Sequence, residues 1–441
     1  MSRLSGILSH LGRRILTVIA VVAVLGAGAW AVAQPSLQLA ADCTGGYLGA
    51  PTGACGPYVP LTPTRILDTR SDLGHSGPVN AGETITLPVV GSNGVPGEGG
   101  ASAVVLNVTV SSPTNFSDLI VYPGGGDLPS TSNLNFVPGE TVANLVEVQL
   151  GSDGGVSFYN LAGSVQVIAD LEGYVATSSY GSGLYNPVTS TRVLDTRNGT
   201  GGTTGPVAAD TSISFPVAGL AGIPSSGNIE AVVFNLTATE ATGNGDITAF
   251  TDEDPHTATS NLNFTAGQPA VANRVIAKVE GGQVNLYFNA LNGTGTVQLI
   301  ADVNGYFTSS DSNVSSGSDF NAQPPQRIAD TRSGVPIGPG ATVNINVAGE
   351  GGVPAIDSAT PPTAVVLNVT VTDPSAASDL VVWTDGQDMP GTSDINFVAG
   401  QTQPNLVVVP LTQTGDGAGE VSFYNLAGTT DIVVDVEGWY S

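Results

Sequence analysis

The sequence predicts an all-β protein built from three tandem β-sandwich domains of jelly-roll type, which follow an N-terminal signal segment. One set of motifs occurs three times along the 441 residues. Each copy consists of short strand-like runs separated by Gly, Pro, Asn and Asp clusters, and no stretch after the signal segment has a convincing 3.6-residue apolar period. Seven or eight short strands at this spacing are typical of a two-sheet sandwich or jelly roll.

Residues 1–33 have the pattern of an export signal. Three arginines, Arg3, Arg13 and Arg14, precede an apolar region that runs from Ile15 to about Ala29, and a small-x-small sequence, Ala31–Ala33, follows. The apolar run is near the lower length limit of a membrane span, so an uncleaved anchor is the alternative. We expect a secreted or cell-surface protein that contacts a membrane only through this segment, if it is retained.

Residues 34–62 are rich in Gly and Pro and contain the two cysteines of the chain, Cys43 and Cys55. In an exported protein, two nearby cysteines predict a local disulfide. A zinc site is not expected, because no nearby histidine completes one.

Four sequence blocks occur in the same order in each copy. The copy opens with Arg-x-x-Asp-Thr-Arg, continues through a Val-Val-x-Asn run and a Ser-Asn-Leu-Asn-Phe block, and closes with an Asp followed by Gly-Tyr. The third copy departs from the pattern at Ala329, Asp394 and Trp439. A repeat of about 130 residues is too long for solenoid or propeller units of about 20–50 residues. We therefore expect three domains, at residues 63–175, 190–307 and 326–441.

The stretches between the copies, residues 176–182 and 308–318, are rich in Ser, Gly and Asn. Such compositions are typical of flexible linkers, so we expect the domains to be arranged like beads on a string. Within the first copy, the sequence predicts strands over residues 84–90, 103–110, 118–122, 134–137, 144–150, 156–160 and 165–171. In residues 106–110, apolar and polar side chains alternate, which gives that strand one apolar and one polar face.

Charge excludes some partners. Only 11% of residues are charged, yet the net charge is −26. Nucleic acid is not an expected partner, since its phosphates require Lys and Arg. Hydrophobic residues make up 41% of the chain, which is enough to form buried cores.

The opening motif contains most of the basic residues that follow the signal segment; only Arg274 and Lys278 lie outside it. In an extended segment, its Asp and second Arg project to the same face, and Arg forms bidentate hydrogen bonds with carboxylates. We interpret the motif as an ion pair that fixes the first strand to the last, with the second Arg bound to the motif's Asp or to another carboxylate such as Asp170. The alternative is an arginine that binds an anionic ligand. The motif residues are Arg65, Asp68 and Arg70, then Arg192, Asp195 and Arg197, then Arg327, Asp330 and Arg332.

Three matched aspartates, Asp118, Asp246 and Asp379, start a central strand in each copy. Together with carbonyl and Asn oxygens, they are candidate ligands of Ca²⁺, which takes six to eight oxygens. No EF-hand loop is present, so the alternative is that they are turn and hydrogen-bonding residues. Calcium is the one cofactor that the sequence suggests.

Aromatic and Asn side chains together are typical of a sugar-binding face. The candidate aromatic residues, at one matched position, are Tyr122, Phe250 and Trp383, and the candidate amides, at another, are Asn135, Asn263 and Asn396. The alternatives are that the aromatic rings belong to the core and that the amides satisfy backbone groups at turns.

No catalytic constellation occurs in all three copies. The histidines after the signal segment, His75 and His256, are at unmatched positions, and no Gly-x-Ser-x-Gly, HExxH or phosphate-binding loop is present. Paired carboxylates would suit a glycosidase, but three tandem active sites in small domains would then be required. We therefore expect a protein that is not an enzyme, with a glycoside-acting enzyme as the least favoured alternative.

The repeat resembles a domain of secreted actinobacterial proteins, in which "LDTR", "SNLNF" and "IADVxGYF" blocks occur in tandem. Residues 67–70, 132–136 and 300–307 carry the resemblance, which covers about residues 63–441. The resemblance implies export and tandem organisation, and it supplies no ligand.

Two functional hypotheses follow. In the first, a non-catalytic surface protein binds cell-wall or extracellular polysaccharide through three weak sites that act together by avidity. This hypothesis predicts exposed aromatic residues at the matched position. In the second, the chain is a structural or adhesive spacer without a small ligand, and the matched residues are buried. The sequence does not determine the oligomeric state.

Overall fold

The computed structural model describes residues 55–177, 183–225, 227–251, 258–310 and 316–441. Almost all regular structure in these ranges is antiparallel β-strand, and their only helix is a 3₁₀ turn, η1 (Thr331–Ser333). The all-β prediction is confirmed. Within these ranges, no helix has the length and apolar character needed to cross a membrane. The predicted signal segment and Cys43 lie outside the described residues.

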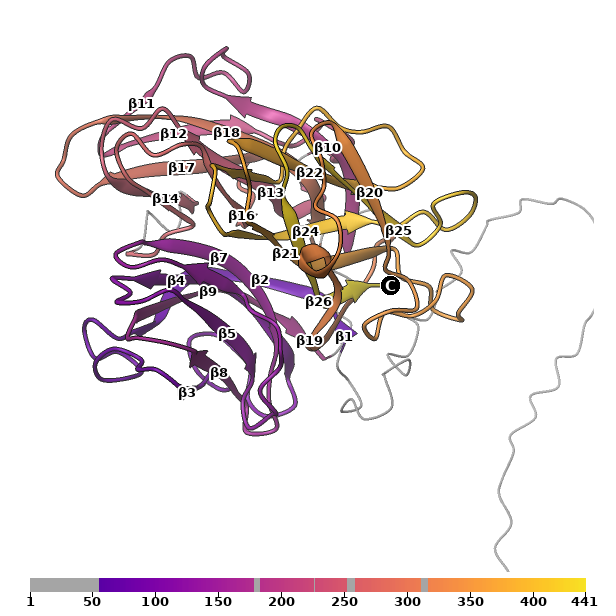
Figure 1. Ribbon diagram of the computed structural model, residues 1–441, viewed down its shortest axis with the longest axis horizontal. Helices are drawn as coiled ribbons and strands as arrows, with labels where there is room; N and C mark the ends of the chain where they lie inside the picture. The colour runs from indigo at the N-terminus through magenta and orange to yellow at the C-terminus, as the bar shows by residue number, and fades with distance from the viewer. Residues whose placement is uncertain (1–54, 178–182, 226, 252–257, 311–315) are drawn as a thin grey trace, which may run out of the picture. The chain divides into compact units, whose positions relative to one another are not determined.

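Each repeat forms two small antiparallel sheets, which we call its inner and outer sheets (Figure 1). The inner sheet contains the opening and closing strands of the repeat. In repeat 1 its order is β2 (Tyr58–Asp68), β9 (Gln166–Ala176), β4 (Ala101–Ser111) and β7 (Val142–Gln149). The outer sheet of repeat 1 has the order β3 (Glu83–Pro88), β8 (Gly155–Asn160), β5 (Ser117–Pro123) and β6 (Leu134–Phe136).

Repeats 2 and 3 have the same strand order. The inner sheet of repeat 2 is β10 (Tyr185–Asp195), β18 (Thr296–Thr308), β13 (Ile229–Thr239) and β16 (Val271–Lys278). The short strand β11 (Val207–Ala208) also pairs with β18. The outer sheet of repeat 2 is β12 (Thr211–Pro216), β17 (Gln283–Ala290), β14 (Gly245–Phe250) and β15 (Leu262–Phe264). The inner sheet of repeat 3 is β1 (Cys55–Gly56), β19 (Phe320–Asp330), β26 (Asp431–Tyr440), β21 (Ala364–Thr372) and β24 (Gln403–Pro410); its outer sheet is β20 (Ala341–Asn346), β25 (Glu420–Asn425), β22 (Ser378–Thr384) and β23 (Ile395–Phe397).

The two sheets of each repeat share one hydrophobic cluster. In repeat 1, Leu106 and Val108 of the inner sheet pack in the same cluster as Leu119 and Phe158 of the outer sheet. Corresponding clusters are present in repeats 2 and 3. The alternation predicted for residues 106–110 places the apolar side chains in this cluster, as the two-residue period of a strand requires.

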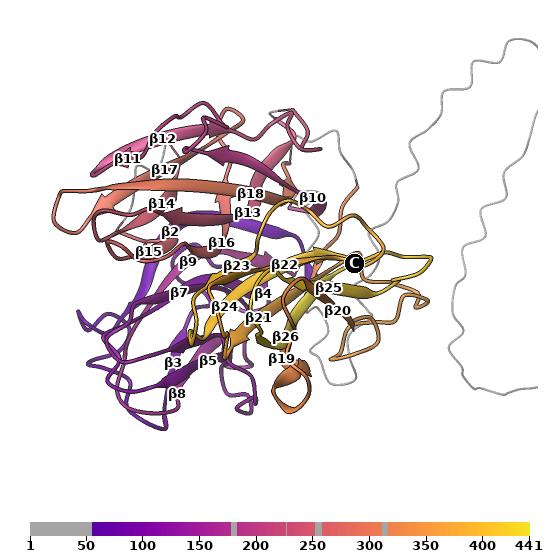
Figure 2. The ribbon, with the colours of Figure 1, turned by 45° about the horizontal axis from the view of Figure 1, so that its top comes forward.

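The opposite faces of the inner sheets meet at one common centre. A fourth cluster combines Val105, Val233 and Val366 from the three repeats with the rings of Tyr185 and Tyr440. The strands β7, β16 and β24, one from each repeat, contact one another there (Figures 1 and 2). The three inner sheets therefore surround a shared core, each with its outer sheet on the far side, and the six blade-like sheets form one compact unit. The prediction of three sandwich domains arranged like beads on a string is wrong.

Two rows of asparagines close the three repeats into a ring. Asn107 of repeat 1 donates to the backbone oxygen of Ser260 in repeat 2, and its own Oδ1 accepts from Asn273, 2.8 Å away. The same pair of contacts joins repeat 2 to repeat 3 and repeat 3 to repeat 1, through Asn235 with Ser393 and Asn405, and through Asn368 with Ser132 and Asn144. The polar face of the central strand is thus buried against the next repeat, where each amide satisfies groups that would otherwise be costly to bury.

The glycine of each closing block makes room for an aromatic ring of the opening strand. A Cβ atom on Gly173 would lie 2.5 Å from the hydroxyl oxygen of Tyr58, and one on Gly305 would lie 2.5 Å from that of Tyr185. Both rings belong to the shared central cluster. The glycine of each closing block is therefore required by the packing of the centre.

Candidate functional site

The opening motif joins the first strand of each repeat to the last. Nε and Nη2 of Arg65 donate to the two carboxylate oxygens of Asp170, at 2.8 and 3.0 Å. Arg70 does not reach Asp170; it binds Asp68 through Nε and Nη2, at 2.9 and 2.7 Å. The hydrogen bonds from Arg70 hold the pKa of Asp68 below its usual value, whereas burial raises the pKa of Asp170 despite its ion pair.

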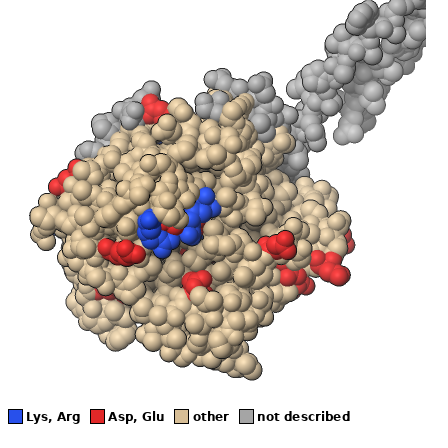
Figure 3. Space-filling view, turned by 90° about the horizontal axis from the view of Figure 1, so that it is seen from above, with Lys and Arg blue, Asp and Glu red and all other residues tan. Residues whose placement is uncertain are grey.

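Repeats 2 and 3 have the same two ion pairs, Arg192–Asp302 with Arg197–Asp195 and Arg327–Asp435 with Arg332–Asp330. On the face shown in Figure 3, the basic side chains form one small group and the acidic ones are scattered. All motif arginines that the structure describes thus lie against carboxylates of their own repeat.

The three matched aspartates lie at the starts of β5, β14 and β22, as predicted. Burial raises the pKa of Asp246 to about 6 and also raises the pKa of Asp118 and Asp379. In the ranges that the structure describes, no group of three or more His, Cys, Asp or Glu side chains is placed to hold a metal ion. The calcium hypothesis gains no support from these residues.

The matched amides lie in β6, β15 and β23, and each contacts the turn before its strand. Asn135 and Asn396 accept from the hydroxyls of Ser132 and Ser393, and Asn263 donates to Ser260. These amides do not lie beside the matched aromatic residues. Asn263 instead lines a cleft between repeats 1 and 2, together with Arg65, Arg70 and Asp246.

The matched aromatic residues lie at the ends of β5, β14 and β22, next to the opening strand of a neighbouring repeat. Tyr122 is buried, whereas Phe250 and Trp383 are half-buried. A groove between repeats lies at each of these places, but its size differs: about 880 Å³ at the end of β5, about 20 Å³ beside Phe250 and about 310 Å³ beside Trp383. Of these three grooves, only the one at Trp383 combines an accessible aromatic ring with the room for a ligand.

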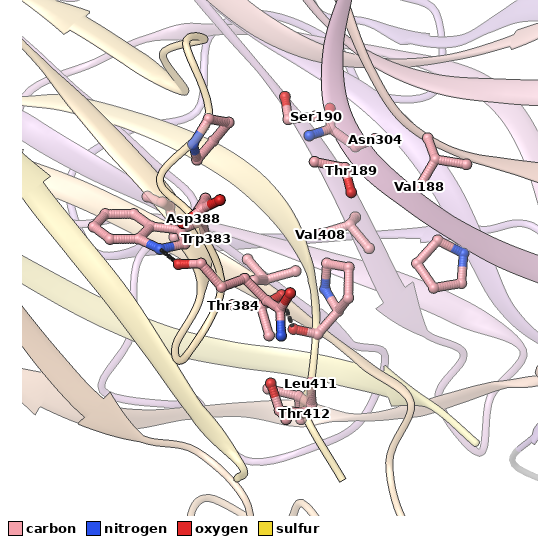
Figure 4. Close-up of a pocket in the computed structure, with 16 residues that line it drawn as sticks. Val188, Thr189, Ser190, Asn304, Trp383, Thr384, Asp388, Val408, Leu411 and Thr412 are labelled. Atoms are coloured by element: carbon pink, nitrogen blue, oxygen red, sulfur yellow. Dashed lines mark hydrogen bonds between the residues drawn. The ribbon is translucent and has the colours of Figure 1, made fainter. Parts of the chain in front are cut away.

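The Trp383 groove has walls from two repeats (Figure 4). Thr189, Ser190 and Asn304 come from repeat 2, and Trp383 and Asp388 come from repeat 3. The indole nitrogen of Trp383 donates to the backbone oxygen of Gln387, 3.1 Å away, which fixes the ring at the edge of the groove. Ligand pockets are typically lined in this way, by apolar surface and a few oriented polar groups.

A buried ion pair lies behind the groove. Arg274 is fully buried and donates to Asp394 at 2.9 Å, and a second nitrogen of its guanidinium donates to Oδ1 of Asn304. The other carboxylate oxygen of Asp394 accepts from the backbone nitrogen of Val382, 2.8 Å away and next to Trp383 in the chain. The ion pair therefore positions side chains on both walls of the groove.

Sequence reasoning did not assign Arg274 and Asn304 to a site. Arg274 stands where the other repeats have Leu145 and Leu406, and Asn304 stands where they have Glu172 and Glu437. These departures from the repeat pattern were the available signal. They could not be interpreted without knowing that β16, β18 and β23 meet at one interface.

The centre of the ring also contains buried carboxylic acids that the sequence did not predict. Glu172 accepts from Asn261 at 3.3 Å, Glu437 accepts from Asn133 at 3.1 Å, and Glu147 lies 3.5 Å from the hydroxyl of Tyr440. Burial raises the pKa of Glu147 to about 8 and places those of Glu172 and Glu437 well above the usual range. Burial therefore disfavours the charged form of each of these acids.

Cys55 belongs to β1, and its predicted partner, Cys43, lies outside the described residues. The disulfide stays a prediction.

No protein-family model matches the chain, and no curated protein matches it. Among solved structures, similarity was found to the Sulfolobus turreted icosahedral virus, with 11% identity over 87% of this chain and 90% of the other and a TM-score of 0.16. A structure described as a triple jelly roll fold of an archaeal virus has 10% identity, 88% and 89% coverage and a TM-score of 0.17. The tandem CBM22 domain of Paenibacillus barcinonensis Xyn10C has 10% identity, 56% and 98% coverage and a TM-score of 0.16. At TM-scores this low, the similarity carries no argument about this chain.

Proposed function

We propose that this chain is a secreted, non-catalytic surface protein that binds a saccharide of the cell wall or of an extracellular polysaccharide in the Trp383 groove. The observation that carries the proposal is the convergence, at one interface, of Trp383 with three departures from the repeat pattern: Arg274, Asn304 and Asp394. Together they give one groove an aromatic ring and oriented polar groups, while its counterparts lack an accessible ring or are closed.

The chemistry of the groove suits a neutral sugar. The C–H face of a pyranose packs on an aromatic ring, and its hydroxyl groups need nearby donors and acceptors. Hydroxyls of Thr189 and Ser190, the amide of Asn304 and the carboxylate of Asp388 line the same groove. Arg274 binds Oδ1 of Asn304, which leaves the amide nitrogen of Asn304 to donate to a ligand (Figure 4).

The sequence predicted three equivalent sites at the matched aromatic position, and the proposal retains only the one at Trp383. Tyr122 is buried and the groove at Phe250 is nearly closed, so avidity from three matched aromatic platforms is not part of it.

Co-sedimentation with insoluble polysaccharides tests the proposal. We expect the purified protein to bind Gram-positive cell wall, chitin, cellulose or xylan in a saturable manner. Changing Trp383→Ala should weaken that binding about thirtyfold, which corresponds to the loss of about 2 kcal/mol that is typical of a Trp whose side chain dominates a binding contact. Phe116→Ala is the matched control, because Phe116 is an exposed aromatic residue outside the groove. Equal binding by the wild type and Trp383→Ala would reject the groove as the site.

A structural or adhesive spacer is the second candidate. Its supporting observation is that the matched asparagines on the central strands are buried between repeats and hold the ring together. Failure of all four polysaccharides to bind would favour the spacer.

A further inference from the structure

A second cleft of ligand size lies between repeats 1 and 2, away from the Trp383 groove. Its volume is about 640 Å³, within the range of about 300–1,000 Å³ that is usual for small-molecule sites. Arg65, Arg70 and Ile168 line it from repeat 1, and Asp246, Asn263, Tyr287, Asn289 and Leu291 line it from repeat 2. No residue is shared with the Trp383 groove.

The repeat 1 wall presents arginines that are already held in place. Asp170 binds Arg65 through both carboxylate oxygens, and it also accepts from the backbone nitrogen of Ser260 in repeat 2, at 3.0 Å. Asp68 binds Nε and Nη2 of Arg70, whose side chain is about half exposed. A guanidinium has five N–H donors, so each arginine keeps donors for a ligand while its position is fixed.

The repeat 2 wall presents acceptors and apolar surface. Asp246 accepts from Nδ2 of Asn289 at 3.0 Å, which orients its carboxyl group at the cleft. The ring of Tyr287 and the exposed side chain of Leu291 supply apolar contact area beside it. Donors on one wall therefore face acceptors on the other, across a surface that is partly apolar.

The charges of the cleft argue against an anionic ligand. Two arginines are balanced by Asp68 and Asp170, and Asp246 adds a further carboxyl group. A ligand without net charge avoids repulsion from this set, and vicinal hydroxyl groups can accept from a guanidinium and donate to a carboxyl group at the same time.

We propose that this cleft is a second saccharide site, which binds a segment of a neutral oligosaccharide through vicinal hydroxyl groups. The site is independent of Trp383, so two sites on one molecule would allow the protein to cross-link two glycan chains or to hold one chain at two points. A similar juxtaposition occurs between repeats 3 and 1, where Arg327 lies close enough to Asp118 to lower the pKa of that carboxyl group against the effect of burial.

Calorimetric titration of the full protein tests the site. The probes are neutral hexasaccharides of β-1,4-linked glucose, xylose, mannose and N-acetylglucosamine. We expect Asp246→Ala and, separately, Asn263→Ala to weaken one class of sites at least tenfold, while Trp383→Ala leaves that class unchanged. Thermal melting of each variant identifies loss of fold, and two substitutions on the same wall guard against one that fails to fold.

The outcomes separate the two sites. Binding that survives Trp383→Ala and is lost in Asp246→Ala supports the cleft whatever happens at the groove. Binding that is lost entirely in Trp383→Ala and unchanged in both cleft variants overturns the cleft and leaves the groove. A wild-type protein that binds none of the four hexasaccharides overturns the cleft, and the co-sedimentation experiment then decides the groove separately.

Discussion

At the residue scale, Arg274 is the most informative side chain of the described chain. It is fully buried, and its charge is balanced by Asp394, which is also buried. The other repeats place Leu and Asn at these two positions and Glu at the position of Asn304. One interface of the ring thus uses an ion pair where the other two use a hydrogen bond between an amide and a buried glutamic acid side chain. This difference favours the pairing of repeat 2 with repeat 3 at this interface, and repeat 1 lacks the residues for it.

Arg274→Leu should lower the free energy of unfolding by about 3–5 kcal/mol, because it leaves Asp394 buried without a counterion. The triple variant Arg274→Leu, Asp394→Asn and Asn304→Glu converts the interface to the type found elsewhere in the ring. We expect it to recover at least half of the loss, since the uncompensated charge is gone. Urea unfolding followed by circular dichroism measures both values. A triple variant no more stable than Arg274→Leu would contradict this account of the pair.

At the element scale, the motif arginines fall into two classes. Arg65 crosses from β2 to β9 and binds a fully buried carboxylate, whereas Arg70 binds an Asp two residues away in its own segment. Only the first pair fixes one strand to another.

Arg65→Met should therefore destabilise the protein by about 2 kcal/mol, since Asp170 loses two charge-assisted hydrogen bonds. Arg70→Gln should cost about 0.5 kcal/mol, because its side chain is about half exposed and solvent screens the pair. Differential scanning calorimetry of the two variants gives the comparison, and equal shifts in melting temperature would argue against the distinction.

The strands were predictable from sequence because the residue types within a strand, and the turn residues that bound it, are local properties. All seven strands expected in repeat 1 are present, and their ends differ from the expected ones by only a few residues, except that β9 continues to Ala176. The alternation in β4 also gave the inward face correctly. The alternation does not show what covers the other face of β4. Asn107 and Thr109 have the polar pattern of a solvent-exposed face, yet both are buried against repeat 2.

The candidate site was also not fully predictable, because it depends on contacts between repeats. Tyr122, Phe250 and Trp383 occupy one position in the sequence repeat, but the strand that bears each of them ends beside the opening strand of a different repeat. Their exposure depends on contacts between copies, which a single repeat does not specify. Trp383 could be selected from the sequence as an aromatic candidate, whereas Asn304 could be selected only once the interface was known.

At the scale of the whole molecule, the central acids make the stability of the assembly depend on pH. The pKa of Glu147 is about 8 in the folded protein and about 4.5 for an unperturbed side chain. Tyr58, Tyr185, Tyr440, Glu172 and Glu437 face the same centre, and burial raises the pKa of each. As the pH rises from about 4.5 to about 8, the unfolded chain releases the proton of Glu147 while the folded chain retains it, so stability falls across this window.

Glu147→Gln should remove up to about 1.4 kcal/mol per pH unit from that decline, which is the contribution of one proton. Urea unfolding at pH 5, 6, 7 and 8 measures the slope for the wild type and the variant. Glu98→Gln, at an exposed position, is the control and should leave the slope unchanged. Parallel slopes for the wild type and Glu147→Gln would show that this acid does not titrate as proposed.

The ring of asparagine contacts has a consequence for chain connectivity. Repeat 3 contacts repeat 1 through side chains at the same repeat positions as those that join the consecutive repeats. These contacts therefore do not depend on where the polypeptide starts. Connections run from Ala176 to Tyr185 and from Thr308 to Phe320. A circularly permuted protein, in which a connector of similar length joins Tyr440 to Tyr58 and new ends are opened between repeats 1 and 2, should therefore assemble the same three interfaces.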